Sequence, residues 1–127
     1  MKNLKCYLLF LPAFFFLQSA TTSVQEPAAA KLKYPKKVNA IIQEKCYGCH
    51  SPEGKGDKAK QKLMWDELLQ LNAAEQSEKL QNIVKVLEEG KMPPARFLEK
   101  MPEKKLTEAE TAKLKKWAEK AIKKNSK

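Results

Sequence analysis

The sequence predicts a small all-α domain. Residues that favour helices, chiefly Leu, Ile, Ala, Lys and Glu, interleave along most of the 127-residue chain. Apolar residues recur three and four positions apart in several segments, and no segment alternates in the way that is typical of a strand. The length leaves room for one small domain once the N-terminal segments described next, residues 1–36, are subtracted.

Residues 1–20 have the pattern of a secretory signal peptide. Lys2 and Lys5 give a basic start, an apolar stretch follows over residues 6–17, and small residues come after it. The apolar stretch is short for crossing a bilayer, which favours a cleaved signal. We expect export to the periplasm or another extracytoplasmic compartment of a bacterium. Association with a membrane is the alternative, if this segment is retained as an anchor.

Residues 21–36 are predicted to be a flexible tether, because they include Pro27, an alanine run and Pro35 but few large apolar side chains. The domain itself is expected over residues 37–124. Its first helix should begin near residue 36 and run into the region of Cys46. The apolar face of this helix is formed by Val38, Ile41 and Ile42.

Three further helical segments are expected. Residues 58–71 are helical by composition, and Asp66 could cap a second short helix within them. A helix over residues 77–89 should end at Gly90. Residues 91–106 are predicted to be a loop, and a capping box of Thr107 and Glu110 begins the last helix. The apolar face of that helix is formed by Leu114, Trp117, Ala118, Ala121 and Ile122.

The chemistry of the chain is concentrated in the run Cys46-Tyr47-Gly48-Cys49-His50. This is a C-x-x-C-H motif, the signature of c-type haem attachment. Two thiols at this spacing can form thioethers with the two vinyl groups on one edge of a porphyrin. The adjacent His50, the only histidine of the chain, is then placed to ligate the iron. The motif predicts one covalently attached haem c, with Cys46, Cys49 and His50 as binding residues.

Other uses of the motif fit the sequence less well. A zinc site needs a fourth ligand, and the expected domain has no further cysteine or histidine. A thiol-disulfide oxidoreductase places C-x-x-C at the head of a helix after a strand, whereas the motif here follows a helix. A peroxidase needs a distal base, for which no second histidine exists.

A methionine is the common sixth iron ligand beside histidine. Met92 is the preferred candidate, because it follows the expected helix end and two prolines stiffen the backbone after it. Met64 is explained by packing between Leu63 and Trp65, and Met101 lies in a charged loop. An open or lysine-ligated iron is the alternative.

The C-Y-G-C-H run, the M-P-P run at Met92 and the pattern L-T-x-x-E-x-x-x-L-x-x-W resemble class I cytochrome c. Over residues 37–121 the chain more closely resembles a family of small, exported bacterial haem-binding domains. The resemblance implies a helical fold wrapped on one haem, with His50 and Met92 as axial ligands and the terminal helices paired.

The expected function is electron transfer by a mono-haem carrier rather than catalysis. A net charge of +10 favours a solvated, lysine-rich helical surface with a mild steering role, and an acidic partner or an anionic membrane surface is the alternative. We expect a redox partner protein, and no motif for binding nucleic acid is present. The alternative is a binding or sensing module whose open sixth position takes a small ligand such as carbon monoxide or nitric oxide. The expected walls of the haem pocket are Leu63, Trp65, Ile83, Leu87, Phe97 and Leu98.

Overall fold

The computed structural model describes residues 31–127, and every regular element in that part of the chain is helical. The elements are α1 (Lys36–Ile41), the π-helical turn η1 (Ile42–Cys46), α2 (Asp57–Lys62), α3 (Trp65–Leu68), α4 (Ala73–Glu88), α5 (Ala95–Leu98), the 3₁₀ turn η2 (Pro102–Lys104) and α6 (Glu108–Asn125). The predicted all-α class is therefore confirmed. The expected signal peptide and residues 21–30 of the expected tether lie outside the described residues. Among residues 31–127, no helix is long and apolar enough to cross a membrane.

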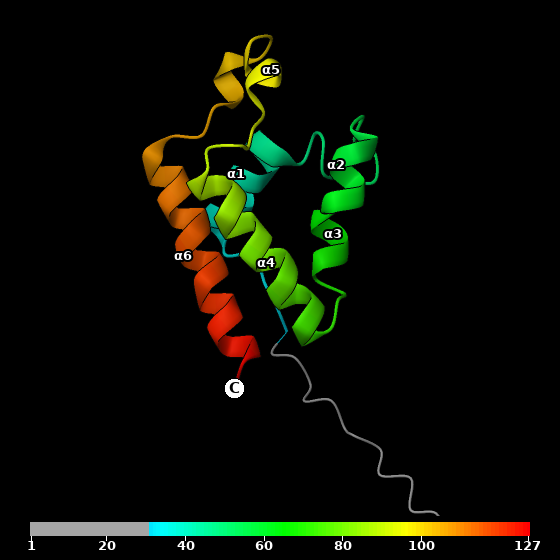
Figure 1. Cartoon of the computed structure of the whole chain (residues 1–127), viewed down its shortest axis with the longest axis vertical. Helices are drawn as coiled ribbons and strands as arrows, with labels where there is room; N and C mark the ends of the chain where they lie inside the picture. The colour runs from blue at the N-terminus through cyan, green and yellow to red at the C-terminus, as the bar shows by residue number, and fades with distance from the viewer. Residues whose placement is uncertain (1–30) are drawn as a thin grey trace, which may run out of the picture.

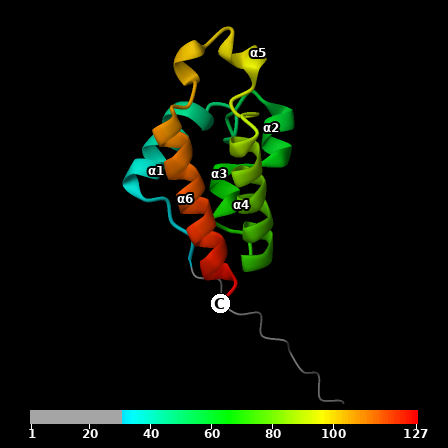
Figure 2. The same cartoon turned by 60° about the vertical axis from the view of Figure 1, so that its left-hand side comes forward.

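The two long helices form the centre of the domain. α4 and α6 lie side by side in both views and make the most extensive contact between helices (Figures 1 and 2). α1 also contacts α6, so the expected pairing of the terminal helices is confirmed, although α4 is the main partner of α6. α2 and α3 flank α4, and α5 and η2 lie together at one end of the molecule (Figure 1).

Both ends of α4 are fixed by local hydrogen bonds. The Asn72 side chain accepts a bond from Glu75 N at 2.9 Å, and Asn72 N donates to the Glu75 carboxylate at 3.3 Å. This capping box starts the helix at Ala73, four residues before the predicted start. At the other end Gly90 has a φ of +61°, which confirms the prediction that the helix ends at this glycine. Lys91 N donates to Val86 O at 2.9 Å, which completes a Schellman motif.

The other predicted helix signals had mixed outcomes. The capping box at α6 is confirmed, since Thr107 Oγ1 accepts from Glu110 N at 3.2 Å and Thr107 N donates to Glu110 at 2.8 Å. Residues 58–71 do divide into two short helices, but Asp66 does not cap the second one. Its carboxylate lies within the first turn of α3 and accepts a bond from Tyr47 Oη at 2.7 Å. The predicted loop 91–106 contains α5 and η2.

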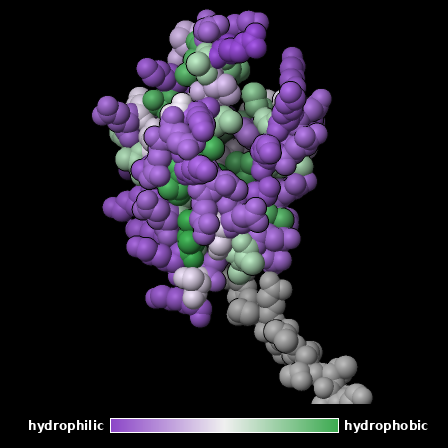
Figure 3. All heavy atoms as spheres, in the orientation of Figure 1, coloured by the Kyte–Doolittle hydropathy of each residue, from purple (hydrophilic) through white to green (hydrophobic). Residues whose placement is uncertain are grey.

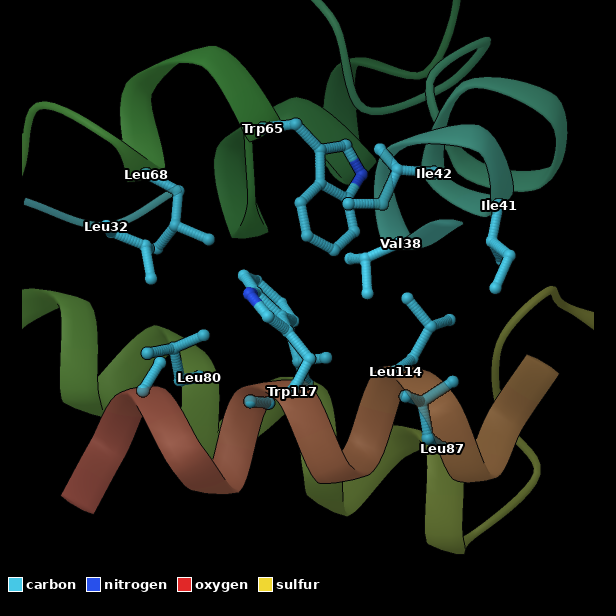
Figure 4. Close-up of a cluster of buried hydrophobic side chains, with 13 residues drawn as sticks. Leu32, Val38, Ile41, Ile42, Trp65, Leu68, Leu80, Leu87, Leu114 and Trp117 are labelled. Atoms are coloured by element: carbon cyan, nitrogen blue, oxygen red, sulfur yellow. The ribbon is translucent and has the colours of Figure 1, made fainter. Parts of the chain in front are cut away.

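The core is built around two tryptophans. The rings of Trp65 and Trp117 lie 6.3 Å apart (Figure 4). Tyr34 packs against both of them. Leu32 is also buried, and Trp117 Nε1 donates to Lys33 O at 3.1 Å. The described end of the expected tether thus packs on the domain. Its main chain and Leu32 reach the core through contacts with residues far along the sequence, which no local pattern reveals.

Replacing Trp117 with alanine should lower the free energy of unfolding by about 3–5 kcal/mol, because a buried ring and its bond to Lys33 are lost. Denaturant unfolding of the haem-loaded protein measures this change. Lys116→Ala, at the exposed neighbouring position, is the control and should change the value by less than about 0.5 kcal/mol. An equally small effect of Trp117→Ala would contradict its place in the core.

Candidate functional site

One large, mainly apolar cavity brings the predicted site residues together. It is lined by Cys46, Cys49, His50 and Met92, and it holds about 860 Å³ of space, including the part that is open to solvent. A mainly apolar lining with a few polar groups is typical of small-molecule and cofactor sites. Figure 3 shows hydrophobic atoms in a hollow between α4 and α2, on a face that is otherwise largely hydrophilic.

Most of the predicted pocket walls are in place. Leu63, Trp65, Ile83, Leu87 and Phe97 line the cavity, whereas Leu98, which was also expected there, does not. Apolar walls that the sequence reasoning missed are Val86, Pro93, Pro94, Leu106 and Leu114. The helical spacing of the α4 residues could have revealed Val86, which lies on the same face as the neighbouring wall residues.

His50 is held by hydrogen bonds to both its ring and its main chain. Its Nδ1 lies 2.9 Å from Leu63 O, and Trp65 N donates to His50 O at 3.1 Å. Because a carbonyl oxygen only accepts, Nδ1 carries the proton of this bond, and in the neutral imidazole Nε2 is then the nitrogen with a free lone pair. A neutral imidazole with its other nitrogen bonded to a carbonyl is the form in which histidine ligates metals.

Cys46 is the last residue of η1, and Cys49 lies on the tight turn that follows it. His50 N donates to Cys46 O at 3.1 Å, and Cys49 N donates to the same oxygen at 3.2 Å. Both thiols are free. Burial, with a smaller contribution from Cys49, raises the pKa of Cys46 to about 12. A thiol that stays protonated is the opposite of the reactive thiolate in thiol-disulfide oxidoreductases, so this environment does not favour that alternative.

The three methionines of the described region have different surroundings. Met92 lines the large cavity, while Met64 lines a separate, smaller one and Met101 lines neither. Met92 follows the Schellman motif that ends α4, and Pro93 and Pro94 line the cavity beside it. Met92 is therefore the thioether that shares a cavity with His50.

A reciprocal lysine pair ties the turn before the motif to the loop that follows Met92. Lys45 Nζ donates to Glu103 O at 2.6 Å, and Lys104 Nζ donates to Glu44 O at 2.8 Å. Lys45 also lies 3.0 Å from the Glu44 carboxylate. These bonds join η1, which lines the cavity through Lys45 and Cys46, to η2, which precedes the lining residue Leu106.

The chemistry of the lining fits haem better than it fits a bare metal ion. Within residues 31–127, no group of three or more His, Cys, Asp and Glu side chains is arranged to hold a metal. The cavity offers one imidazole, one thioether and two thiols in apolar surroundings. In addition, Nε1 of the cavity-lining Trp65 is buried without a hydrogen-bond partner in the described structure. A buried donor without a partner costs about 1–3 kcal/mol.

The turn that carries the motif depends on a close approach at Gly54. A Cβ there would lie 2.6 Å from Cys49 O and 2.9 Å from Ser51 O. Gly54→Ala should therefore displace the turn, lower the free energy of unfolding by about 1–3 kcal/mol and reduce haem content. Denaturant unfolding and haem absorbance measure both effects. Gly48→Ala is the matched control, because its Cβ would meet nothing within 4 Å. Equal effects of the two substitutions would contradict the argument.

The comparisons with known proteins agree with this chemistry. No curated protein and no solved structure matches the chain. The model of the haem-binding domain family matches residues 54–120, which is more than half of the chain. The matched range starts just after His50 and includes α2, α3, α4 and most of α6. The chain is a haem-binding protein and belongs to the haem-binding domain family.

Proposed function

We propose that the protein is an exported c-type cytochrome that carries single electrons, with one haem attached through Cys46 and Cys49 and ligated by His50 and Met92. The observation that carries the proposal is the single apolar cavity lined by these four residues. They come from two segments of the chain that are separated by α2, α3 and α4.

The residues of the cavity have separate tasks in this proposal. When bound, haem supplies an iron that changes its charge by one electron. His50 presents Nε2, and its bond to Leu63 O fixes the ring and strengthens it as a ligand. Met92 supplies a neutral thioether, which favours the less charged ferrous form. The apolar walls also favour the ferrous form, because they exclude water that would stabilise the more highly charged ferric form.

Family membership favours haem binding over catalysis. Export is supported by the signal-like pattern of residues 1–20, and a redox partner with an acidic face is supported by the net charge of +10. A carrier needs both axial positions filled, so that the same ligands stay bound in the two oxidation states. The sixth ligand is therefore the point that distinguishes a carrier from a sensor.

Covalent attachment makes the haem resistant to extraction. After acid–acetone treatment, the intact mass should still include one haem, and it should also reveal whether residues 1–20 have been removed. A Cys46→Ala, Cys49→Ala double variant should lose the covalent haem because both thioethers are gone. Cys6→Ser should keep it, as the control for the third thiol of the chain. Full extraction of haem from the unmodified protein would refute the c-type assignment.

Substitution of Met92 tests the sixth ligand. Met92→Ala should remove the weak long-wavelength band of Met-ligated ferric haem and speed carbon monoxide binding. It should also lower the reduction potential by on the order of 0.1 V, because a ligand that favours ferrous iron is lost. Met101→Ala should change none of these, and it is a fair control because both side chains are 37% exposed.

Two results would change the assignment. If Met101→Ala alters the band and Met92→Ala does not, the assignment of Met92 as the sixth ligand is wrong, but the carrier function stands. If neither substitution matters and the unmodified protein already binds carbon monoxide rapidly, the sixth position is open. The protein would then be a haem-based binding or sensing module.

A further inference from the structure

The charged side chains that line the cavity all have the same sign. Lys45, Lys62 and Lys79 line it, and no aspartate or glutamate does. The ammonium of Lys45 is already bonded to Glu103 O and lies beside the Glu44 carboxylate. The other two lysines belong to different elements, since Lys62 ends α2 and Lys79 lies on α4.

Lys62 and Lys79 form one group with Asn82. Lys79 Nζ donates to Lys62 O at 2.9 Å, which joins α4 to the end of α2. Lys79 and Asn82 are three residues apart on α4, so they lie on the same face of the helix, and both line the cavity. The α2–α4 group, meaning Lys62, Lys79 and Asn82, is thus a polar edge on a mainly apolar cavity.

The charges of this group are not neutralised within the described part of the protein. No carboxylate of residues 31–127 forms an ion pair with Lys62 or Lys79. The one hydrogen bond of the Lys79 ammonium is to a main-chain carbonyl, which carries no charge. Lys62 is exposed and Lys79 is half-buried, so water can solvate both ammonium groups, and both remain free to form charge-assisted hydrogen bonds to an anion in the cavity.

We propose that the α2–α4 group binds the two propionate carboxylates of haem. In this arrangement Lys62 and Lys79 supply the positive charges, and the Asn82 side-chain amide donates a hydrogen bond. Haem carries its vinyl groups and its carboxylates on different edges of the macrocycle. Attachment of the vinyl edge at Cys46 and Cys49 therefore directs the carboxylates toward another part of the cavity wall. The α2–α4 group is the part that offers uncompensated donors. This inference rests on the covalent attachment in the proposed function.

The test measures the pKa of the propionates in the haem-loaded full chain. NMR of the haem resonances, recorded as a function of pH at low salt, gives the midpoint of this titration. A nearby cation lowers the pKa of a carboxyl group, so its removal raises that pKa. A Lys62→Gln, Lys79→Gln double variant should raise the midpoint by about half a pH unit or more. The difference from the unmodified protein should shrink at high salt, because the cations are partly exposed.

The matched control is a Lys58→Gln, Lys85→Gln double variant. It makes the same change in net charge on the same two helices, at exposed positions that do not line the cavity. Its midpoint should stay close to that of the unmodified protein. An unchanged midpoint in the Lys62, Lys79 variant, or an equal shift in the control, would overturn the inference.

Two further variants keep the result interpretable. If the double variant fails to load haem, Lys62→Gln and Lys79→Gln are measured singly, and each should give part of the shift. Lys79→Arg retains the charge and should keep the original midpoint, whereas a shift as large as that of Lys79→Gln would count against a role for the charge. If the unmodified protein contains no covalent haem, the proposed attachment fails. If it does contain haem but the midpoints do not differ, only the propionate site fails.

Discussion

The hydrogen bond between His50 and Leu63 O joins the site to the rest of the fold. Leu63 and Trp65 are two residues apart, so the segment that fixes the imidazole also places a large ring in the core. That ring packs against Trp117 (Figure 4) and against Tyr34. Displacement of the core therefore moves the carbonyl that holds His50, and the orientation of the imidazole depends on packing contributed by α6 and by residues before α1.

The interior is shared between a packed core and a cavity. Trp65, Leu87 and Leu114 belong to both, because they are buried among core residues and also line the cavity. In so small a domain, side chains alone bury limited apolar surface, and a bound cofactor adds to it. Since haem binds to these walls only when they are assembled, its binding free energy contributes to the stability of the fold.

Local signals predicted the ends of helices well where a side chain caps its own helix. Thr107 with Glu110 and the positive φ at Gly90 are features of this kind. Asn72 with Glu75 is another, but Ala73 and Ala74 follow Asn72 in place of an apolar stripe, so the pattern predicts a later start of the helix. The C-x-x-C-H run could be singled out because covalent haem attachment needs those residue types at that spacing, and Met92 because it follows a helix end and precedes two prolines.

Other features depend on groups that leave no pattern in the sequence. The acceptor of the His50 ring proton is a main-chain oxygen, which every residue possesses. The burial of Leu32 and the bond from Trp117 to Lys33 O arise from contacts between the two ends of the described chain. The pairing of α4 with α6 likewise follows from three-dimensional packing, because the apolar face of α6 does not itself identify α4 as its main partner.

The reciprocal lysine pair has a consequence for the behaviour of the protein in acid. Lys45 and Lys104 each donate to a main-chain carbonyl, at Glu103 and Glu44, and carbonyl oxygens do not titrate in the range where carboxylates do. Surface ion pairs such as Lys91 with Glu89 weaken when the carboxylate is protonated. Acidification therefore leaves the acceptors of both bonds between η1 and η2 in place, although it removes the ion pair of Lys45 with the Glu44 carboxylate along with the other surface ion pairs. Acetylation of the two lysines, in contrast, would remove their charge and most of their donor capacity at any pH.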